Sequence, residues 1–362
     1  MTVHIIGNEG DYHSVAVHWG LKKLGLHSHI WATPGYRQSQ SMTMKYPKFD
    51  IVLGGVKLNK SDTVWIRRPL LPEIHPNTSD LDKKFCTNEY KEAFDGLLNS
   101  FEYVKLCANS YKAQRQMERK AMQLRIAFDS DFLIPKTIIT NNQDEAKEFI
   151  NQLSSSCIYK TFLPHIWDSE EKRTLNMTAT TKINIDDLND AFIAQSSPLI
   201  LQEYIDKLHD VRVTVMGKVM IAVAIVNKNK LEAPPVDWRP KHNHTPMSIV
   251  CVTIPEKIKN KIILFMERAG LAFSCLDFSI DKMGEWWFLE SNATGQFLWI
   301  EDDEKKLNML SIFCSFLSSG DKNFNCMKIN SSINLIEFEK SEEFINLQKT
   351  SKLGGQSFIT KE

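Results

Sequence analysis

The sequence predicts a protein of several domains that belong to the α/β and α+β fold classes. An apolar strand at 3–7, an amphipathic helix at 14–24 and a second strand at 29–32 follow one another, which is typical of a parallel sheet. Later, apolar strands at 211–216 and 219–226 flank a Gly-Lys turn, which favours an antiparallel hairpin. The chain has 362 residues, enough for two or three domains of ~100–200 residues each.

Composition and charge exclude several classes of protein. Hydrophobic residues make up 43% and charged residues 24% of the chain, which is ordinary for a globular protein and not for a disordered or collagen-like one. Forty-four Lys and Arg balance forty-four Asp and Glu, so no overall field attracts nucleic acid or an anionic membrane. The seven scattered cysteines include no Cys-x-x-Cys pair, and the first residues do not resemble a signal peptide. We therefore expect a cytoplasmic protein with reduced thiols and with neither nucleic acid nor a membrane as partner.

Residues 1–108 are predicted to form a small α/β domain. A third strand is expected at 63–66, after the opening strand, helix and strand. Gly7 and Gly10 do not complete a Gly-x-Gly-x-x-Gly motif, so a tight turn is favoured over dinucleotide binding in the loop after the first strand. A strong helix is expected at about 87–106, because apolar residues recur on one face of it at helical spacing. These residues are Phe94, Leu97, Leu98, Phe101 and Val104.

The rest of the chain alternates helices and strands. Pro255 precedes a predicted helix at 256–269 that ends at Gly270, and both residues stand where helix ends favour them. Two further strands are expected on either side of 281–284, and a helix near 303–317. The other expected elements are helices at 112–127 and 144–153 and strands at 133–140, 157–161 and 199–203.

A predicted hairpin brings two carboxylates and an amide together. If its turn is centred between residues 283 and 284, Asp277 lies opposite Glu290, because both are equally far from the centre. Opposed residues share a face of a sheet, as do residues i and i+2, so Asp277, Glu290 and Asn292 are expected to project together. Such oxygen donors suit Mg²⁺ held between protein and phosphates. In the alternative, one carboxylate pairs with an arginine or lysine and the other groups are solvated.

Four basic residues are candidates for binding phosphate oxygens. Lys120 lies on a predicted helix and Lys160 ends a predicted strand. Arg212 lies between valines in a hairpin, where a merely solvated arginine is not expected, and Arg239 follows Asp237-Trp238. Taken singly, each of these residues is explained more simply as a surface charge.

The order of these motifs resembles that of the ATP-grasp ligases. A lysine on a helix, a lysine ending a strand, Gln-Glu-Tyr-Ile, Asp-x-Arg-Val, Leu-Asp-Phe and Glu-x-Asn follow one another as in that superfamily. Within it, residues 1–318 resemble the peptide maturases that build graspetides, the microviridin-type ω-ester and ω-amide macrocycles. The most family-specific segment is 290–301. The other similar segments are 65–69, 118–124, 202–205, 210–215 and 237–239.

The resemblance implies an ATP-grasp fold with an N-terminal α/β pre-ATP-grasp domain at 1–108. A central lobe at 109–200 and a C-terminal lobe at 201–320 are then expected to bind ATP between them. Residues 321–362 form a tail of unknown role outside this pattern. We expect the tail to be disordered; docking on the enzyme and mimicry of a leader peptide are the alternatives.

The resemblance also assigns the residues that bind ATP. Lys120 and Lys160 are expected to neutralise its phosphate oxygens. The backbone of the hinge is expected to bind adenine, Glu203 to accept a hydrogen bond from the exocyclic amine, and Asp206 to face the ribose. The hinge residues are Gln202, Glu203, Tyr204 and Ile205.

Catalytic and metal-binding roles follow from the same resemblance. Arg212 and Arg239 are expected to hold the transferred phosphoryl group or the acyl phosphate, because a guanidinium fork is rigid and always charged. The Mg²⁺ ligands implied are Asp277, Glu290 and Asn292.

The implied activity is that of an ADP-forming ligase. It activates a side-chain Asp or Glu of a ribosomal precursor peptide, with leader and core, as an acyl phosphate and closes an ω-ester or ω-amide ring. Two alternatives stay open: a ligase that joins small acids and amines or adds amino acids to a protein, and a nucleotide-binding regulator without turnover. The sequence does not determine whether the product is an ester or an amide, which peptide is the substrate, or how many rings form and how they are connected. It does not determine the oligomeric state either, for which a homodimer is one option.

Overall fold

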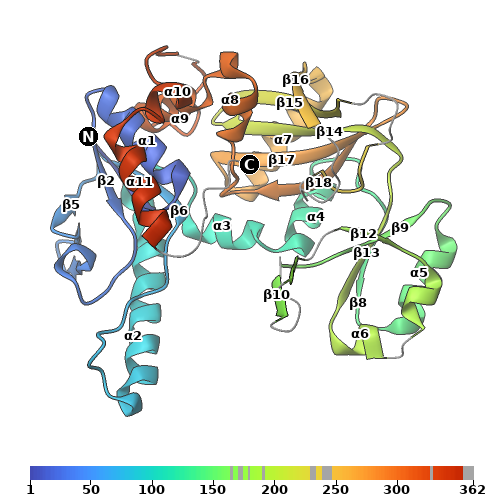
Figure 1. Cartoon of the computed structure of the whole chain (residues 1–362), viewed down its shortest axis with the longest axis horizontal. Helices are drawn as coiled ribbons and strands as arrows, with labels where there is room; N and C mark the ends of the chain where they lie inside the picture. Colours follow the sequence, from blue (N-terminus) through green and yellow to red (C-terminus); the bar gives the residue numbers. More distant parts are fainter. Residues whose placement is uncertain are drawn as a thin grey trace.

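The structure of the chain is a computed structural model (Figure 1). It describes residues 1–163, 166–169, 174–177, 180–189, 192–228, 234–238, 247–326 and 329–353. Figure 1 shows three bodies side by side: an N-terminal domain that carries the last helices of the chain, a large antiparallel sheet in the middle, and a smaller sheet at the far end. The candidate site lies where the two antiparallel sheets meet.

The N-terminal sheet is parallel and has the strand order β2-β1-β6-β7. The predicted strand–helix–strand opening is confirmed by β1 (Thr2–Gly7), α1 (Tyr12–Lys23) and β2 (His27–Trp31). Helix α1 begins after Asp11, because the Asp11 carboxylate accepts a hydrogen bond from the Ser14 amide at 2.8 Å. The remaining strands of this domain are β6 (Thr63–Arg68) and β7 (Leu106–Cys107), and a separate sheet of β3 (Met42–Lys45), β4 (Asp50–Leu53) and β5 (Val56–Leu58).

Helix α2 (Asp80–Asn99) starts earlier than expected and extends away from the domain (Figure 1). Its start is fixed by Ser79, whose hydroxyl accepts from the Asp82 amide. A 3₁₀ turn at Ser100–Tyr103 continues it. The predicted apolar face is confirmed, because all of its residues are buried in one core with β6 and β4.

The central sheet is antiparallel, with the order β12-β9-β13-β8. One face packs on α5 (Gln143–Gln152), where Leu199 and Leu201 join Ala146 in a small core. The strands are β8 (Thr137–Thr140), β9 (Cys157–Lys160), β12 (Thr181–Ile183) and β13 (Leu199–Glu203). Nearby elements are α6 (Phe192–Ser196), the turn Ile185–Leu188 and the pair β10 (Ile166–Ser169) and β11 (Thr174–Met177).

The C-terminal sheet has the order β16-β15-β14-β17-β18, and all its strand pairs are antiparallel. The hairpin predicted around Gly217 is confirmed, and Gly217 has φ +61°, a value that favours glycine. Helix α7 (Glu256–Ala269) ends as predicted at Gly270, which is left-handed. The strands are β14 (Lys207–Met216), β15 (Val219–Asn227), β16 (Met247–Cys251), β17 (Phe273–Asp281) and β18 (Trp286–Asn292).

The helix predicted at 112–127 is two helices, α3 (Tyr111–Met117) and α4 (Lys120–Asp129). The backbone of Arg119 is extended (φ −90°, ψ 108°), which interrupts the helix just before Lys120. Both helices pack with α7 on the C-terminal sheet, where Met117 and Ile126 share a core with Val213. This packing joins them to the C-terminal sheet; the domain limits at 108, 200 and 320 stay predictions.

The tail is folded wherever the structure describes it, which corrects our expectation of disorder. Helices α10 (Leu335–Phe338) and α11 (Glu342–Leu353) follow α8 (Trp299–Asp303) and α9 (Met309–Ser319). Phe338 and Phe344 contact the ring of Tyr12 on α1, with centroid distances of 5.4 and 6.1 Å. The buried Glu301 carboxylate accepts from the amides of Leu310 (2.8 Å) and Leu335 (2.7 Å). Apolar residues spaced through the tail thus complete the core between α1 and α9.

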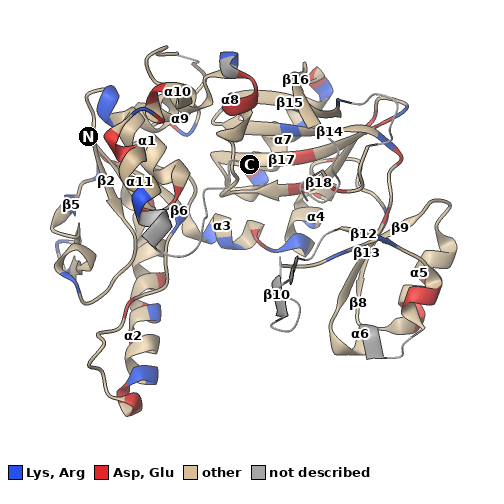
Figure 2. Ribbon diagram, in the orientation of Figure 1, with Lys and Arg blue, Asp and Glu red and all other residues tan. Residues whose placement is uncertain are grey.

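Charged residues of both signs are distributed over all three bodies (Figure 2). This agrees with the balanced composition, forty-four basic against forty-four acidic residues. Within the described ranges, none of the helices has the length and apolar character needed to span a bilayer.

Candidate active site

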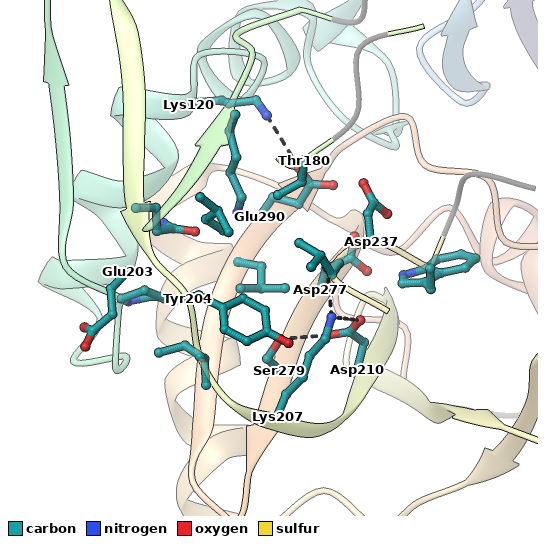
Figure 3. Close-up of a pocket in the computed structure, with 18 residues that line it drawn as sticks. Lys120, Thr180, Glu203, Tyr204, Lys207, Asp210, Asp237, Asp277, Ser279 and Glu290 are labelled. Atoms are coloured by element: carbon teal, nitrogen blue, oxygen red, sulfur yellow. Dashed lines mark hydrogen bonds and ion pairs between the residues drawn. The ribbon is translucent and has the colours of Figure 1, made fainter. Parts of the chain in front are cut away.

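A pocket lies between the central and the C-terminal sheets (Figure 3). It holds about 690 Å³ of empty space, part of it open to solvent. The predicted site residues that line it are Lys120, Lys160, Gln202, Glu203, Tyr204, Ile205, Asp277 and Glu290. Asp206, Arg212 and Asn292 are not part of this lining, and Arg239 lies outside the described residues.

Two lysines reach the pocket from different elements. Lys160 is the last residue of β9, opposite Ile200 of β13, and Lys120 is the first residue of α4. The Lys120 Nζ lies 3.9 Å from Oε2 of Glu290, and each side chain is 27% exposed. An ion pair of this length and exposure is weak, so a phosphate oxygen can replace the carboxylate.

The hairpin β17–β18 places Asp277 directly opposite Glu290, as predicted. Towards the turn the register shifts, because Leu289 is an extra residue and Phe278 pairs with Phe288. The pairing predicted by equal distance from the turn is therefore correct from Asp277 to Cys275 and wrong for the residues nearer the turn. The two carboxylates of the predicted metal site share one face of the sheet.

Arg212 makes a buried two-pronged ion pair with Asp277. Its Nε donates to Oδ1 at 2.5 Å and its Nη2 to Oδ2 at 3.2 Å, and both side chains are at most 7% exposed. Its Nη1 donates to the Gln296 carbonyl at 3.2 Å. Asp277 thus follows the alternative considered for the carboxylates, pairing with an arginine, and its role as a metal ligand stays a proposal.

Aromatic rings complete the surroundings of Arg212. Its guanidinium lies 5.9 Å from the ring centroids of both Trp238 and Trp299, which are themselves 5.4 Å apart. Val211 and Val213 are buried in the core beneath α7, so Arg212 projects from the opposite face, as the alternation predicts. Cation–π contacts and the carboxylate together offset the cost of burying the charge.

Both Gln202 and Glu203 line the pocket, but the hinge directs the side chain of Gln202, and not that of Glu203, to the pocket side of the central sheet. Gln202 pairs with Ile158, whereas Glu203 pairs with Cys157 on the α5 side. Figure 3 shows the Glu203 carboxylate turned away, and it accepts from the Ser155 hydroxyl at 3.4 Å. The acceptor role expected for this carboxylate is not supported by that position. Gln202 donates from Nε2 to the Thr137 hydroxyl at 2.8 Å, and within the described residues its buried Oε1 has no partner.

A buried network in the pocket, which the sequence did not predict, joins Lys207, Asp210 and Ser279. The Lys207 Nζ donates to Asp210 Oδ2 (2.6 Å) and to the Val236 carbonyl (3.0 Å). The Ser279 hydroxyl donates to Asp210 Oδ1 at 2.7 Å. Asp210 and Arg212 are two residues apart on β14, so they lie on the same face of the sheet. The alternation that predicts the direction of Arg212 therefore also places Asp210 on the pocket face. Asp206, by contrast, pairs with Lys282 on the surface at 2.5 Å.

Tyr204 lines the pocket and has charged groups near it. The Lys182 Nζ is 3.9 Å from its ring centroid. Burial, with the carboxylates of Asp206 and Asp210, raises the pKa of its hydroxyl. Tyr204 therefore stays a neutral hydrogen-bonding group at any physiological pH.

Asn292 ends β18 and begins the loop that leads to α8. Its side-chain oxygen accepts from the Thr294 amide at 3.1 Å, and Asn292 is exposed opposite Cys275. Over the described ranges, no three His, Cys, Asp or Glu side chains form a preassembled metal cluster. The donors near the pocket are the two carboxylates of one strand pair and an amide oxygen two pairs further along the hairpin, beside two lysines, which fits a hard cation shared with phosphates.

Two antiparallel sheets meet at one pocket that lysines and carboxylates line, which is the arrangement expected of an ATP-grasp fold. Neither a protein-family model nor a curated protein matches the sequence. Solved structures do match. A RiPP-associated ATP-grasp ligase from Chryseobacterium gregarium, in complex with ADP and a leader and core peptide, has a TM-score of 0.75 and 22% identity, covering 90% of this chain and 99% of its own.

Two further structures match over similar lengths. The macrocyclase MdnC from Microcystis aeruginosa, bound with precursor peptide MdnA, has a TM-score of 0.71 and 18% identity, covering 89% of this chain and 100% of its own. The ATP-grasp ligase PsnB, complexed with a phosphomimetic variant of a minimal precursor, Mg and ADP, has a TM-score of 0.68 and 19% identity, covering 88% and 98%. The chain has the fold of these RiPP ATP-grasp ligases, so the resemblance found in the sequence is confirmed at the level of the fold.

Proposed function

We propose that the chain is an ATP-dependent ligase that closes ester or amide rings in a ribosomal precursor peptide. A side-chain Asp or Glu of the peptide attacks the γ-phosphorus of ATP, and ADP leaves. A Ser or Thr hydroxyl, or a Lys amine, then attacks the acyl phosphate, and phosphate leaves. The observation that carries the proposal is the pocket that unites Lys120, Lys160 and Glu290 within this fold.

The nucleotide is proposed to lie with its base at the hinge and its phosphates at the two lysines. The free Oε1 of Gln202 suits the exocyclic amine of adenine, which donates a hydrogen bond, whereas guanine has a carbonyl acceptor at the same position. Asp210, buried in the pocket between Lys207 and Ser279, replaces the surface residue Asp206 as the carboxylate near the ribose. Lys120 and Lys160 neutralise the phosphate oxygens.

The chemical step is proposed to depend on fixed charge. Phosphoryl transfer needs positioning and charge neutralisation more than covalent help. Arg212, held on Asp277 and beside the rings of two tryptophans, is proposed to stabilise the charge on the transferring phosphoryl group or the acyl phosphate. Arg239 is proposed for the same anion. Glu290, with Asp277 and Asn292, would hold Mg²⁺, which when bound supplies further neutralisation of the phosphates.

The peptide substrate is proposed from the solved structures that match. The ligase from Chryseobacterium gregarium and MdnC were each solved with peptides, and PsnB with a precursor, Mg and ADP. These ligands belong to those proteins; for this chain they support a precursor peptide as substrate and ATP with Mg²⁺ as cosubstrate and cofactor.

The proposal is tested by mass spectrometry. The full chain is incubated with ATP, Mg²⁺ and a short Thr- and Glu-rich peptide encoded beside its gene, and we expect the loss of one water for each ring formed. Mild alkaline hydrolysis reverses an ester and leaves an amide intact, so the same sample assigns the product. An unchanged peptide mass, with ADP bound normally, would refute the proposed function.

A matched pair of variants shows whether the product comes from this pocket. Glu290→Gln keeps the shape and removes one charge from the proposed Mg²⁺ site, so ADP formation and dehydration should collapse while the fold survives. Glu285→Gln makes the same change in the exposed turn of the same hairpin and should act as the wild type. Equal activity of the two variants would remove Glu290 from the site.

A further inference from the structure

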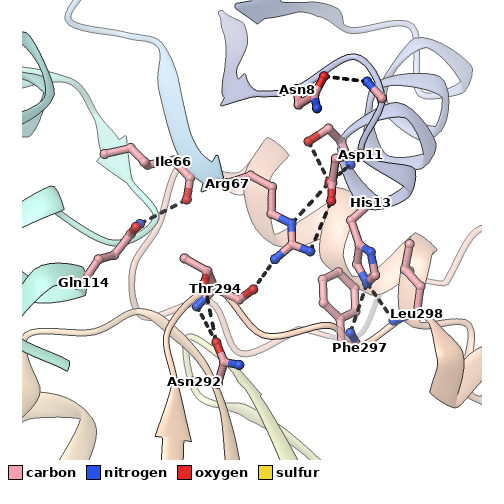
Figure 4. Close-up of polar contacts among 12 residues, drawn as sticks. Asn8, Asp11, His13, Ile66, Arg67, Gln114, Asn292, Thr294, Phe297 and Leu298 are labelled. Carbon is pink, nitrogen blue, oxygen red and sulfur yellow. Dashed lines mark hydrogen bonds and ion pairs between the residues drawn. The ribbon is translucent and has the colours of Figure 1, made fainter. Parts of the chain in front are cut away.

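The loop at 292–298, which follows β18, is held by side chains from several distant parts of the chain (Figure 4). Side chains accept hydrogen bonds from its amides and donate them to its carbonyls, which fixes the conformation of its backbone. His13 on α1 accepts from the amides of Phe297 (3.1 Å) and Leu298 (3.3 Å). The donors to its carbonyls are Asn109 to Ala293 (2.9 Å), Arg67 to Thr294, and Arg212 to Gln296 (3.2 Å).

Arg67 is the member of this set that comes from the N-terminal sheet. Its side chain is 0% exposed, and its Nε and Nη2 donate to the two carboxylate oxygens of Asp11 at 3.3 and 3.4 Å. Its Nη1 donates to the Thr294 carbonyl. Each nitrogen of the fork therefore has its own partner, as a buried guanidinium requires.

The fold directs Arg67 towards the loop through a β-bulge. Ile6 pairs with Ile66 but Gly7 pairs with Arg68, so Arg67 is an extra residue between the two rungs. Bulges of this kind re-aim a side chain. Gly7 leaves room for it, because a Cβ there would lie 2.7 Å from the Ser14 hydroxyl and 3.3 Å from Cβ of Arg67. The glycine that we assigned to a tight turn thus serves a close approach.

We propose that Arg67 is a positioning residue, which holds the loop so that Asn292 and Arg212 are correctly placed at the nucleotide. The amide of Thr294 donates to the Asn292 side chain at 3.1 Å, while its carbonyl is held by Arg67. Two residues later the Gln296 carbonyl is held by Arg212, which also grips Asp277. One peptide segment thus connects the N-terminal domain to the proposed metal and phosphate groups. This inference rests on the proposed function.

Arg67→Lys should loosen the loop without removing the charge. One lysine nitrogen cannot serve both Asp11 oxygens and the Thr294 carbonyl in the geometry of the fork. Groups that orient metal ligands typically change metal affinity by about 10- to 100-fold when they are lost. We expect the Mg²⁺ concentration for half-maximal effect on ADP binding to rise about tenfold, and ADP affinity without Mg²⁺ to stay unchanged, because the hinge and lysines are untouched.

The experiment is calorimetric titration of the full chain with ADP over a series of Mg²⁺ concentrations. The variants are Arg67→Lys and Asp11→Asn, which weakens the same contact from the other side and keeps an oxygen to cap α1. The matched control is Arg37→Lys, a 58% exposed arginine of the same domain whose ion pair with Glu73 is on the surface. The control should bind as the wild type does.

The outcomes separate a positioning role from a structural one. A raised Mg²⁺ requirement in both variants, with thermal unfolding near that of the wild type, supports the inference. An unchanged Mg²⁺ requirement in either folded variant, or an equal loss of ADP affinity with and without Mg²⁺, overturns it. If Arg67→Lys does not fold, Asp11→Asn decides alone. Wild-type protein that binds ADP with Mg²⁺ but does not dehydrate the peptide refutes the proposed function and leaves this inference standing.

Discussion

Arg212→Lys separates the geometry of the guanidinium from its charge. Arg212 uses three nitrogens, for Asp277 Oδ1 (2.5 Å), Asp277 Oδ2 (3.2 Å) and the Gln296 carbonyl (3.2 Å). A lysine ammonium in the same space keeps the positive charge but loses about two of these hydrogen bonds. Hydrogen bonds to charged groups contribute about 1.5–3 kcal/mol each, so the free energy of unfolding should fall by about 3–6 kcal/mol.

The effect on the reaction should exceed the effect on binding. A fixed donor that faces developing charge contributes about 3–4 kcal/mol to the transition state, which corresponds to a rate loss of roughly 100-fold or more. ATP should bind within a few-fold of wild type, because Lys120 and Lys160 contact the pocket from other elements. We therefore expect Arg212→Lys to lower the turnover rate much more than the affinity for ATP.

Single-turnover dehydration followed by mass spectrometry, beside calorimetry with ATP, measures both quantities. Arg268→Lys, at the exposed end of α7, is the control for an arginine-to-lysine change that touches no site residue. If Arg212→Lys retains most of the single-turnover rate, the ion pair with Asp277 is structural and the argument for transition-state stabilisation is wrong. The simpler interpretation of Arg212 as a surface charge disagrees with its burial on Asp277.

Three further changes test other parts of the structure. Lys160→Ala should weaken ATP by about tenfold or more and AMP by less, because a charged contact of about 1.5–3 kcal/mol would be lost at the distal phosphates; equal losses in calorimetry would move Lys160 away from them. Burial, with the nearby Arg67, holds the pKa of the His13 side chain well below its usual range. Below about pH 6.5 the unfolded chain therefore binds a proton that the folded chain does not, and the free energy of unfolding falls by about 1.4 kcal/mol per pH unit for this group, with no change above that pH. Urea unfolding between about pH 5 and 6.5 should show a shallower slope for His13→Gln, and an identical slope would contradict this assignment. Phe338→Ala, at a fully buried position of the tail, should lower stability by about 3–5 kcal/mol, whereas Ile336→Ala, 44% exposed, should change it little; similar values for the two would mean that the tail is not part of the core.

Local patterns predicted the elements of the site. The distance from the turn placed Asp277 opposite Glu290, and alternation along β14 placed Arg212 on the face away from Val211 and Val213. Pro255 and the left-handed Gly270 marked the ends of α7. These features depend on strand periodicity and helix ends, which neighbouring residues determine. The same local rules explain the error near the turn, because a one-residue bulge at Leu289 has no signature in spacing.

The sequence by itself determined the secondary structure of the pocket, the pairing of its two carboxylates and the resemblance to a ligase fold. Only the tertiary structure decided which groups meet across long separations in the chain. Arg67 contacts Thr294 over 227 residues, and the tail residue Glu339 meets Tyr12 over 327. Such contacts depend on how whole domains pack to bury apolar surface. Local sequence patterns around one partner therefore do not predict which distant residue it contacts. For this reason the docked tail and the grip on the loop at 292–298 emerged from the structure, although every residue in them was visible in the sequence.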